Sequence, residues 1–262
     1  MPKNISKRPK IAIYDFTDCE GCEVKLVSVK ERLLHLANRF DIVNWRLGQE
    51  QIKDGPYAAA IIEGAPVTQD EIDLLRELRK KSKLIISLGA CASIAGIPGI
   101  MNKSERTKWY KKIYGANYKP RGLDALPLSA YVKVDHAIHG CPVDEDELIR
   151  TLEELLSGKT PHYRGYSACL ECKLAGNQCR LLNRQICFGP ITQGGCKAVC
   201  VSGGSPCYGC FGIREEANIP TLVKILRKFA SEKEINNHVT MFFNQIPEYK
   251  NAFKQALKNY TK

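Results

Sequence analysis

The sequence predicts an α/β protein in which a parallel sheet is followed by an irregular, cysteine-rich domain. Two observations lead to this prediction. Over about the first 160 residues, short apolar runs alternate with segments whose apolar residues recur every three or four positions, as in strands and amphipathic helices. Beyond that point the periodicity fades, and eight of the twelve cysteines lie between His162 and Cys210. A length of 262 residues suits one large domain or two unequal ones.

The expected elements of the first part follow one another along the chain. Apolar runs predict strands at residues 10–16, 41–46, 58–63 and 83–88, and a fifth strand that ends within 137–142. Helical spacing and stop or start signals predict helices from about 23 to 40, after the capping box at 68–71, and at 144–157. Strands that alternate with helices form a parallel sheet covered on both faces.

Four cysteines fall at the expected ends of these strands. Cys19 and Cys22 follow the first strand, Cys91 follows the fourth, and Cys141 follows the fifth. Ligand sites in such sheets lie beyond the carboxyl ends of the strands. We therefore expect these four cysteines to converge at one edge of the sheet, although they are far apart in the sequence.

The second part of the chain changes character near residue 160. We expect a first domain at 1–160 and a second at 161–262, in which residues 220–229 and 248–260 are amphipathic helices. Between the fourth and fifth strands, residues 101–126 are rich in Lys, Arg and aromatic side chains, with Trp109 and Tyr110 among them. Basic residues interleaved with aromatics can hold single-stranded nucleic acid, but a surface excursion or a protein interface is the commoner explanation.

The remaining eight cysteines divide into two sets of four. One set has the spacing CxxC-x6-C-x7-C and comprises Cys169, Cys172, Cys179 and Cys187. The other has the spacing C-x3-C-x6-CxxC and comprises Cys196, Cys200, Cys207 and Cys210. Glycine and proline separate most of these cysteines, and the segment has too few large apolar residues to form its own core. Bound metal is therefore expected to stabilise it.

The sequence context favours metal over disulfides. There is no recognisable signal peptide and no membrane-length apolar segment, so we expect a cytoplasmic protein without a membrane span, whose thiols stay reduced. Two CxxC pairs can bind zinc, whereas four thiolates also suit an iron–sulfur cluster. A site built from three loops of a large sheet, near two more four-cysteine sets, favours iron–sulfur clusters and an electron path.

The net charge of +11 raises the question of nucleic-acid binding. Thiolate-ligated clusters are negatively charged, so part of this basicity would balance their charge. No RNA-binding signature accompanies the basic residues, and we expect no nucleic-acid partner.

Several motifs, in order, resemble those of one family. They are Cys19-Glu-Gly-Cys22-Glu, Glu63-Gly-Ala, Gly89-Ala-Cys91-Ala, Gly140-Cys141-Pro142, Cys169-Leu-Glu-Cys172, Cys187-FGPIT-x3-Cys196 and Pro206-Cys207-Tyr-Gly-Cys210. From residue 10 to 212 the chain resembles the small, electron-transferring subunit of NiFe hydrogenases. The likeness is greatest to the cytoplasmic group 3 branch, which includes the sulfhydrogenase delta subunit and the methanogen small subunits. That resemblance implies a flavodoxin-like first domain and a cluster-binding, iron–sulfur second domain.

The resemblance also implies how the cysteines are used. The proximal 4Fe–4S cluster would be held by Cys19, Cys22, Cys91 and Cys141; the medial one by Cys196, Cys200, Cys207 and Cys210; the distal one by Cys169, Cys172, Cys179 and Cys187. Periplasmic relatives have His where this chain has Cys169, and Pro with a three-iron cluster where it has Cys200. The resemblance therefore implies three 4Fe–4S clusters, each with four cysteine ligands.

The implied function is electron transfer within an oxidoreductase complex. A separate large subunit would cleave hydrogen at its NiFe centre, and this chain would pass electrons to a flavin- or cluster-containing acceptor subunit. That acceptor would be linked to NAD(P), a deazaflavin or a disulfide reductase. The chain has no nickel-binding motif, so it would be part of the enzyme and not catalytic alone. It also lacks a P-loop and G-x-G-x-x-G, so nucleotide and flavin would bind to other subunits.

Two alternatives remain. A zinc-stabilised, basic nucleic-acid-binding protein would account for the charge and for residues 101–126. A complex I-like iron–sulfur subunit would share the first domain. Such a subunit normally has adjacent cysteines in its first motif and lacks the second cluster domain.

Overall fold

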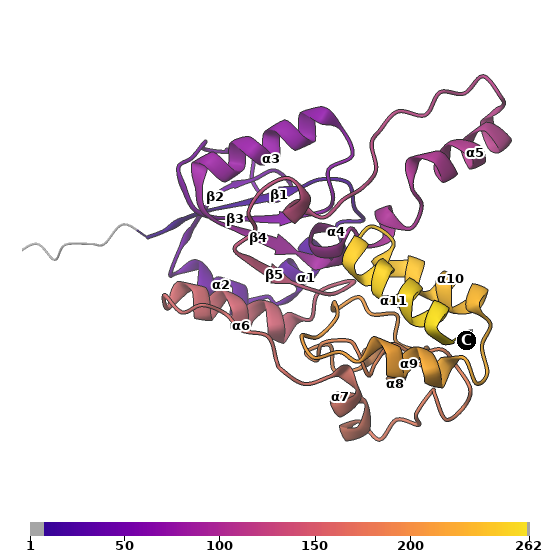
Figure 1. The fold of residues 1–262 in the computed structure, drawn as a ribbon. Helices are drawn as coiled ribbons and strands as arrows, with labels where there is room; N and C mark the ends of the chain where they lie inside the picture. The colour runs from indigo at the N-terminus through magenta and orange to yellow at the C-terminus, as the bar shows by residue number, and fades with distance from the viewer. Residues whose placement is uncertain (1–7, 261–262) are drawn as a thin grey trace, which may run out of the picture.

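The computed structural model describes residues 8–260, in which a parallel sheet is followed by a compact helical and loop region (Figure 1). The expected domain ranges extend into residues 1–7 and 261–262, which lie outside the described part. The strands are β1 (Lys10–Asp15), β2 (Asp41–Trp45), β3 (Tyr57–Glu63), β4 (Ser82–Leu88) and β5 (His136–Ile138). All neighbours in the order β2-β1-β3-β4-β5 are parallel, which confirms the expected α/β class.

Helices of the first part cover both faces of this sheet, except for the one at Lys103–Tyr114, which projects from its edge (Figure 1). They are α1 (Gly21–Ser28), α2 (Glu31–Ala37), α3 (Gln69–Lys81), α4 (Gly89–Ile94), α5 (Lys103–Tyr114) and α6 (Glu145–Leu156), with short 3-10 turns η1 (Ile97–Gly99) and η2 (Leu128–Ala130). One core joins the sheet to α1, α2 and α6, through Leu26, Leu36 and Leu148. A second core lies under α3, where Leu75 and Leu78 pack on the opposite face.

The second part contains α7 (Ala168–Leu174), α8 (Val199–Ser202), α9 (Ile219–Leu226), α10 (Glu232–Phe243) and α11 (Pro247–Tyr260). A third core joins α9, α10 and α11 around Phe188 and Phe243, and it includes Ala90 and Ile94 of α4. Because α4 directly follows the sheet, the second part packs on the same sheet edge that carries Cys91 (Figure 1).

The structure differs from the expected elements at several places, and helix α10 was not expected at all. The helix expected at 23–40 is two helices, because Lys30 has φ of 47° and turns the chain between them. The expected helix at 220–229 ends at Leu226. Residues 101–126 contain a regular helix, α5, whose apolar residues follow no buried stripe. No helix within residues 8–260 is long and apolar enough to cross a membrane.

Candidate electron-transfer site

The sheet brings the first four cysteines together as expected. Cys19 and Cys22 flank the start of α1, Cys91 lies in the first turn of α4, and Cys141 follows β5. The Gly140 carbonyl accepts a hydrogen bond from the Ala90 backbone at 2.7 Å, which joins the loops after β4 and β5. Gly21 lies against both the Cys19 sulfur and Pro142, which joins the loop after β1 to the other two.

The thiols of this set also raise one another's pKa values by electrostatic repulsion. Burial, followed by repulsion from the negative charges of Cys141 and Cys19, raises the pKa of Cys91 to about 12. Cys22 is buried, whereas Cys19 and Cys141 are exposed. The set therefore has one face in the protein and one face open at the surface.

Buried carboxyl groups hold the Cys22 segment in place. Glu63, at the end of β3, is only 2% exposed, and its carboxylate accepts the backbone N–H groups of Cys22 at 3.0 Å and Glu23 at 2.7 Å. The Glu23 carboxylate in turn accepts the Trp45 indole N–H at 2.7 Å. Burial raises the pKa of Glu23, and that of nearby Asp18, to about 7. Glu63 thus acts as the anion that satisfies the N-terminal N–H groups of α1.

The set Cys169, Cys172, Cys179 and Cys187 also meets at one place. Cys169 and Cys172 lie one turn apart on α7. Gly189 lies against both the Cys169 and Cys187 sulfurs, and a Cβ added to it would be 3.1 Å and 3.6 Å from them. Burial, followed by repulsion from the other three thiolates of the set, raises the pKa of Cys169 to about 11.

The set Cys196, Cys200, Cys207 and Cys210 lies between the other two. Cys207 and Cys210 are half-buried, and burial raises the pKa of Cys207 to about 12, with repulsion from Cys187 and Cys196 adding to it. Cys200 is exposed and interacts with two sets, because its charge raises the pKa values of both Cys196 and Cys141. Cys200 therefore lies between Cys196 of its own set and Cys141 of the first set.

A cavity of about 810 Å³ connects the three sets. Eight cysteines line it: Cys141, Cys169, Cys172, Cys187, Cys196, Cys200, Cys207 and Cys210. Glycine, alanine and valine residues give part of the wall little side-chain bulk: Val143, Ala168, Gly189, Ala198, Val199 and Val201. The cavity is thus a thiol-lined space large enough for groups bigger than single ions.

Two backbone N–H groups cross from one set to the next. The Cys141 backbone N–H lies near the Cys210 sulfur and lowers the Cys210 pKa against the larger rise from burial. The Cys207 backbone N–H donates to the Cys187 sulfur at 3.4 Å. One pair of neighbouring sets is therefore joined by a hydrogen bond, and the other pair lies close enough to interact electrostatically.

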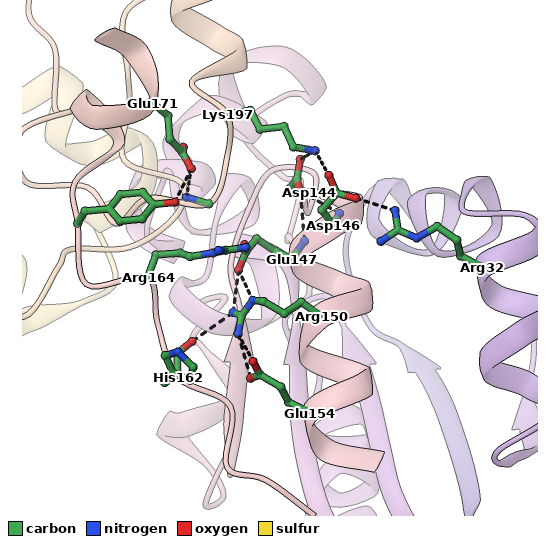
Figure 2. Close-up of polar contacts among 12 residues, drawn as sticks. Arg32, Asp144, Asp146, Glu147, Arg150, Glu154, His162, Arg164, Glu171 and Lys197 are labelled. Atoms are coloured by element: carbon green, nitrogen blue, oxygen red, sulfur yellow. Dashed lines mark hydrogen bonds and ion pairs between the residues drawn. The ribbon is translucent and has the colours of Figure 1, made fainter. Parts of the chain in front are cut away.

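An ion-pair network joins α6 of the sheet to the loop that carries Cys196 (Figure 2). Lys197 forms ion pairs with Asp144 at 3.0 Å and with Asp146, which also pairs with Arg32 at 2.6 Å. Lys197 and Ala198 have positive φ values, 54° and 50°, which are unfavourable for residues with a Cβ. The ion pairs of Lys197 hold this strained turn against the sheet.

A second part of the network is more deeply buried. Glu147 is 8% exposed, and its carboxylate pairs with both Arg150 and Arg164 (Figure 2). Arg164 belongs to the segment that leads into the cysteine-rich region, and Gly195, next to Cys196, lies against the Glu147 side chain. The sequence did not indicate the roles of Glu147 and Lys197. A charged residue in the first turn of a helix or in a loop usually faces solvent, and nothing in the sequence shows that it has a distant partner.

The residues present fit iron–sulfur clusters. Each set supplies four thiols, the ligand set of a 4Fe–4S cluster. Two glycines leave space beside the sulfurs: Gly189, and Gly89, where an added Cβ would collide with the Cys22 sulfur. Within residues 8–260, no group of three or more His, Cys, Asp or Glu side chains is arranged around a single metal ion. His139 is hydrogen-bonded through its Nδ1 to the Ser93 hydroxyl at 2.8 Å.

Comparisons with known proteins agree with this geometry. Residues 19–155 match the family model of the NADH ubiquinone oxidoreductase, 20 kDa subunit. The chain is 33% identical to the sulfhydrogenase 2 subunit delta of Pyrococcus furiosus, over 89% of this chain and 98% of that protein. It is 26% identical to a subunit of the F420-non-reducing hydrogenase of Methanocaldococcus jannaschii, over 78% of this chain and 81% of that one.

A solved structure extends the comparison to three dimensions. The chain superposes on a chain of an NAD+-reducing [NiFe]-hydrogenase in the H2-reduced state with a TM-score of 0.53 and 25% identity, over 60% of this chain and 96% of that one. The family model stops at residue 155, whereas the hydrogenase relatives also match the cysteine-rich part. The chain therefore belongs to the family of the 20 kDa NADH ubiquinone oxidoreductase subunit and, within it, to the electron-transferring small subunits of NiFe hydrogenases.

Proposed function

We propose that this chain relays electrons between the NiFe centre of a separate large subunit and a redox partner subunit through three 4Fe–4S clusters. The proximal cluster would be held by Cys19, Cys22, Cys91 and Cys141; the medial one by Cys196, Cys200, Cys207 and Cys210; the distal one by Cys169, Cys172, Cys179 and Cys187. The chain acts as part of a hydrogenase complex, and its first unit at 1–160 and second at 161–262 divide the cysteines between them.

The observation that carries the proposal is the close approach of neighbouring sets, which one hydrogen bond joins directly. The Cys141 N–H reaches the Cys210 sulfur, and the Cys207 N–H reaches the Cys187 sulfur at 3.4 Å. Three isolated structural sites would need no such contacts. A backbone N–H that links two sets brings their sulfur atoms close together. Electron transfer between the sets requires this proximity.

The chain's own residues give the path its two ends. Bound clusters would supply one-electron chemistry at potentials set by hydrogen bonds to their sulfurs and by solvent exposure. Cys19 is exposed and does not line the cavity, so it is at the end that a large subunit would cover. At the other end, Cys179 is exposed, so the distal set is accessible to an acceptor.

The relatives of this chain suggest what kind of subunit accepts the electrons. The relatives include a sulfhydrogenase and an F420-non-reducing hydrogenase, and the structural neighbour reduces NAD+. We propose a flavin- or iron–sulfur-containing acceptor subunit linked to NAD(P), a deazaflavin or a disulfide reductase, in a cytoplasmic complex.

The deciding experiment is metal analysis of the complex purified without air. We expect about twelve iron and twelve sulfide per chain after the partners' own clusters are subtracted, and no stoichiometric zinc. EPR spectra of the reduced protein should show interacting clusters. Zinc in place of iron would overturn the proposal in favour of a structural metal protein.

A further inference from the structure

A helical arm projects from the sheet edge between β4 and β5 (Figure 1). We define the α5 arm as residues 101–124, that is, helix α5 with the segments on either side of it. No residue of α5 is buried. Large side chains on it are open to solvent: Trp109 is 51% exposed, Ile113 65% and Tyr114 63%. Trp109 and Ile113 are four residues apart, so they lie together on one side of the helix.

The arm is nevertheless firmly built at its base and along its inner side. Asn102 and Glu105 form a capping box at the start of α5. The Arg106 guanidinium donates to the Leu123 carbonyl at 2.5 Å, and the Leu123 N–H donates to the Val67 carbonyl at 2.6 Å. Tyr118 of the return segment packs on the Tyr114 ring at a centroid distance of 4.9 Å. The outer side is therefore held in a fixed position before any partner arrives.

A helix with this exposure needs a covering surface. Twelve residues are too few for a stable isolated helix in water, because helices in proteins gain most of their stability from packing. Solvent-exposed Trp and aliphatic side chains in one patch are typical of interaction sites, and Trp, Tyr and Arg are the residues most often dominant in binding. The outer side of α5, with Trp109 and Ile113, is thus an unpartnered binding surface.

The charge of the arm specifies the chemistry of its partner. Residues 103–121 contain seven basic side chains and one acidic one, Glu105. The Lys112 ammonium lies over the Trp109 ring at 5.1 Å, so a basic group and the aromatic anchor form one unit. A complementary surface is acidic at its rim and has an apolar slot at its centre.

The base of the arm identifies which partner can reach it. The arm begins directly after η1, which follows α4 and its Cys91. The side chains of Asn244 and Gln245 fix η1 through hydrogen bonds to the Gly99 carbonyl, both at 3.1 Å. The arm therefore leaves the sheet edge at which Cys19 is exposed, so that one protein covering this part of the edge can contact both Cys19 and the arm.

We propose that the α5 arm is a clasp that holds the subunit covering the first cysteine set, inserting Trp109 and Ile113 into an apolar slot bordered by acidic residues. The inference rests on the proposed function, because that subunit is the hydrogenase large subunit. It adds the residues that fasten the two chains together. Single-stranded nucleic acid, the other occupant that basic and aromatic residues suit, is an outcome of the test.

The experiment uses the complex purified without air from cells that produce the Trp109→Ala/Ile113→Ala chain. Dilution followed by size-exclusion chromatography measures the dissociation constant between the two subunits, and we expect it to rise about tenfold or more. Leu74→Ala, which changes an exposed apolar residue on α3, is the matched control and should leave the constant unchanged. Equal constants for the arm variant and the parent complex would refute the clasp.

A second variant guards against misfolding and tests the charge. Lys108→Glu/Lys112→Glu keeps the apolar anchors, and we expect it to weaken association and reduce its dependence on salt. About twelve iron per chain in each variant would show that the chain is folded and loaded. Intact clusters with an unchanged dissociation constant would sink the clasp alone, whereas zinc without iron would sink the proposed function. Tight binding of a fluorescent oligothymidylate by the parent complex, lost in Trp109→Ala/Ile113→Ala, would instead assign the arm to nucleic acid.

Discussion

Single glycines decide whether sulfurs can be ligands in this fold. Gly89 has φ of +83°, and a Cβ there would collide with the Cys22 sulfur. Gly158 has a similar φ of +72° but open space around it. A substitution at Gly158 would therefore introduce backbone strain alone, whereas one at Gly89 would also crowd the Cys22 sulfur.

We expect Gly89→Ala to lose the proximal cluster, because the Cys22 sulfur must move away from the added methyl group. Iron should fall from about twelve to about eight per chain. Gly158→Ala should keep all its iron and lower the free energy of unfolding by about 1–2 kcal/mol through strain alone. Iron and sulfide analysis of both variants checks this, and full iron content in Gly89→Ala would contradict it.

The allocation of Cys200 and Cys179 is the second question at this scale. We expect Cys200→Ala to change only the medial signal in EPR, giving a three-iron signal on oxidation and about eleven iron per chain, because the set keeps three thiolates. Cys179→Ala should change only the distal signal. Since Cys200 also lies near Cys141, loss of the proximal signal in Cys200→Ala would reassign it to the first set.

How much could be predicted at this scale depends on whether a residue is recognisable by its spacing. The twelve cysteines and their division into three sets follow from sequence spacing and strand ends. The N–H group of Cys141 that reaches Cys210 does not, because backbone direction inside an irregular loop leaves no mark in the sequence.

At the scale of elements, α6 fastens the sheet to the cysteine-rich part. Its first turn holds Glu145, Asp146 and Glu147, which read alike in the sequence as helix-start charges. In the structure Glu145 pairs with Lys25 at the surface, whereas Glu147 is buried between Arg150 and Arg164. Glu145 and Glu147 therefore differ in how much they stabilise the junction between the sheet and the cysteine-rich part.

We expect Glu147→Gln to lower the free energy of unfolding by about 1–3 kcal/mol, because two arginines lose their charged acceptor. Glu145→Gln should cost only about 0–1 kcal/mol, as exposed ion pairs do. Thermal unfolding of the cluster-loaded chains without air provides the measurement. Equal losses in the two variants would show that the network at Glu147 does not stabilise the junction.

Element prediction succeeded where periodicity and caps agreed and failed where they were absent. The capping box at Thr68 and the strand runs placed the sheet correctly. The break between α1 and α2 was missed, because the apolar spacing continues across Lys30 although its backbone does not. Helix α10 was also missed, yet Ser231 and Glu234 form a capping box that could have indicated its start.

For the whole molecule, the exposed distal end defines where electrons would leave. Leu174 and Leu182 are 80% and 83% exposed near Cys172 and Cys179. Lys173 and Arg184 beside them are also exposed and basic. An apolar surface with basic neighbours at this end favours an acidic redox partner.

We expect Leu174→Asp/Leu182→Asp to slow hydrogen-dependent reduction of the partner subunit's cofactor about tenfold or more, because docking is lost. Reduction of methyl viologen, a small dye that needs no docking surface, should be unchanged. Leu74→Asp on α3 is the control and should affect neither rate. A parallel fall in both rates would mean that the substitutions damage the cluster site itself.

The architecture as a whole was predictable only in part. Alternating elements predicted the parallel sheet, and strand ends predicted the convergence of Cys19, Cys22, Cys91 and Cys141. The contact of the third core with α4 was not predictable, because it joins Ala90 and Ile94 to helices that begin more than a hundred residues later.

The two cores of the sheet have a consequence for how such a protein is made. Apart from Cys22, they consist of ordinary apolar side chains that need no metal to pack. The loops that carry Cys19, Cys22, Cys91 and Cys141 can therefore be shaped once the chain as far as α6 has left the ribosome. The segment from Cys169 to Cys210 contributes only Phe188 and Ile191 to the buried residues of the third core, so we expect delivery of inorganic sulfide and iron to be part of its folding. We therefore expect the sheet to fold first and the clusters of the cysteine-rich segment to be inserted afterwards.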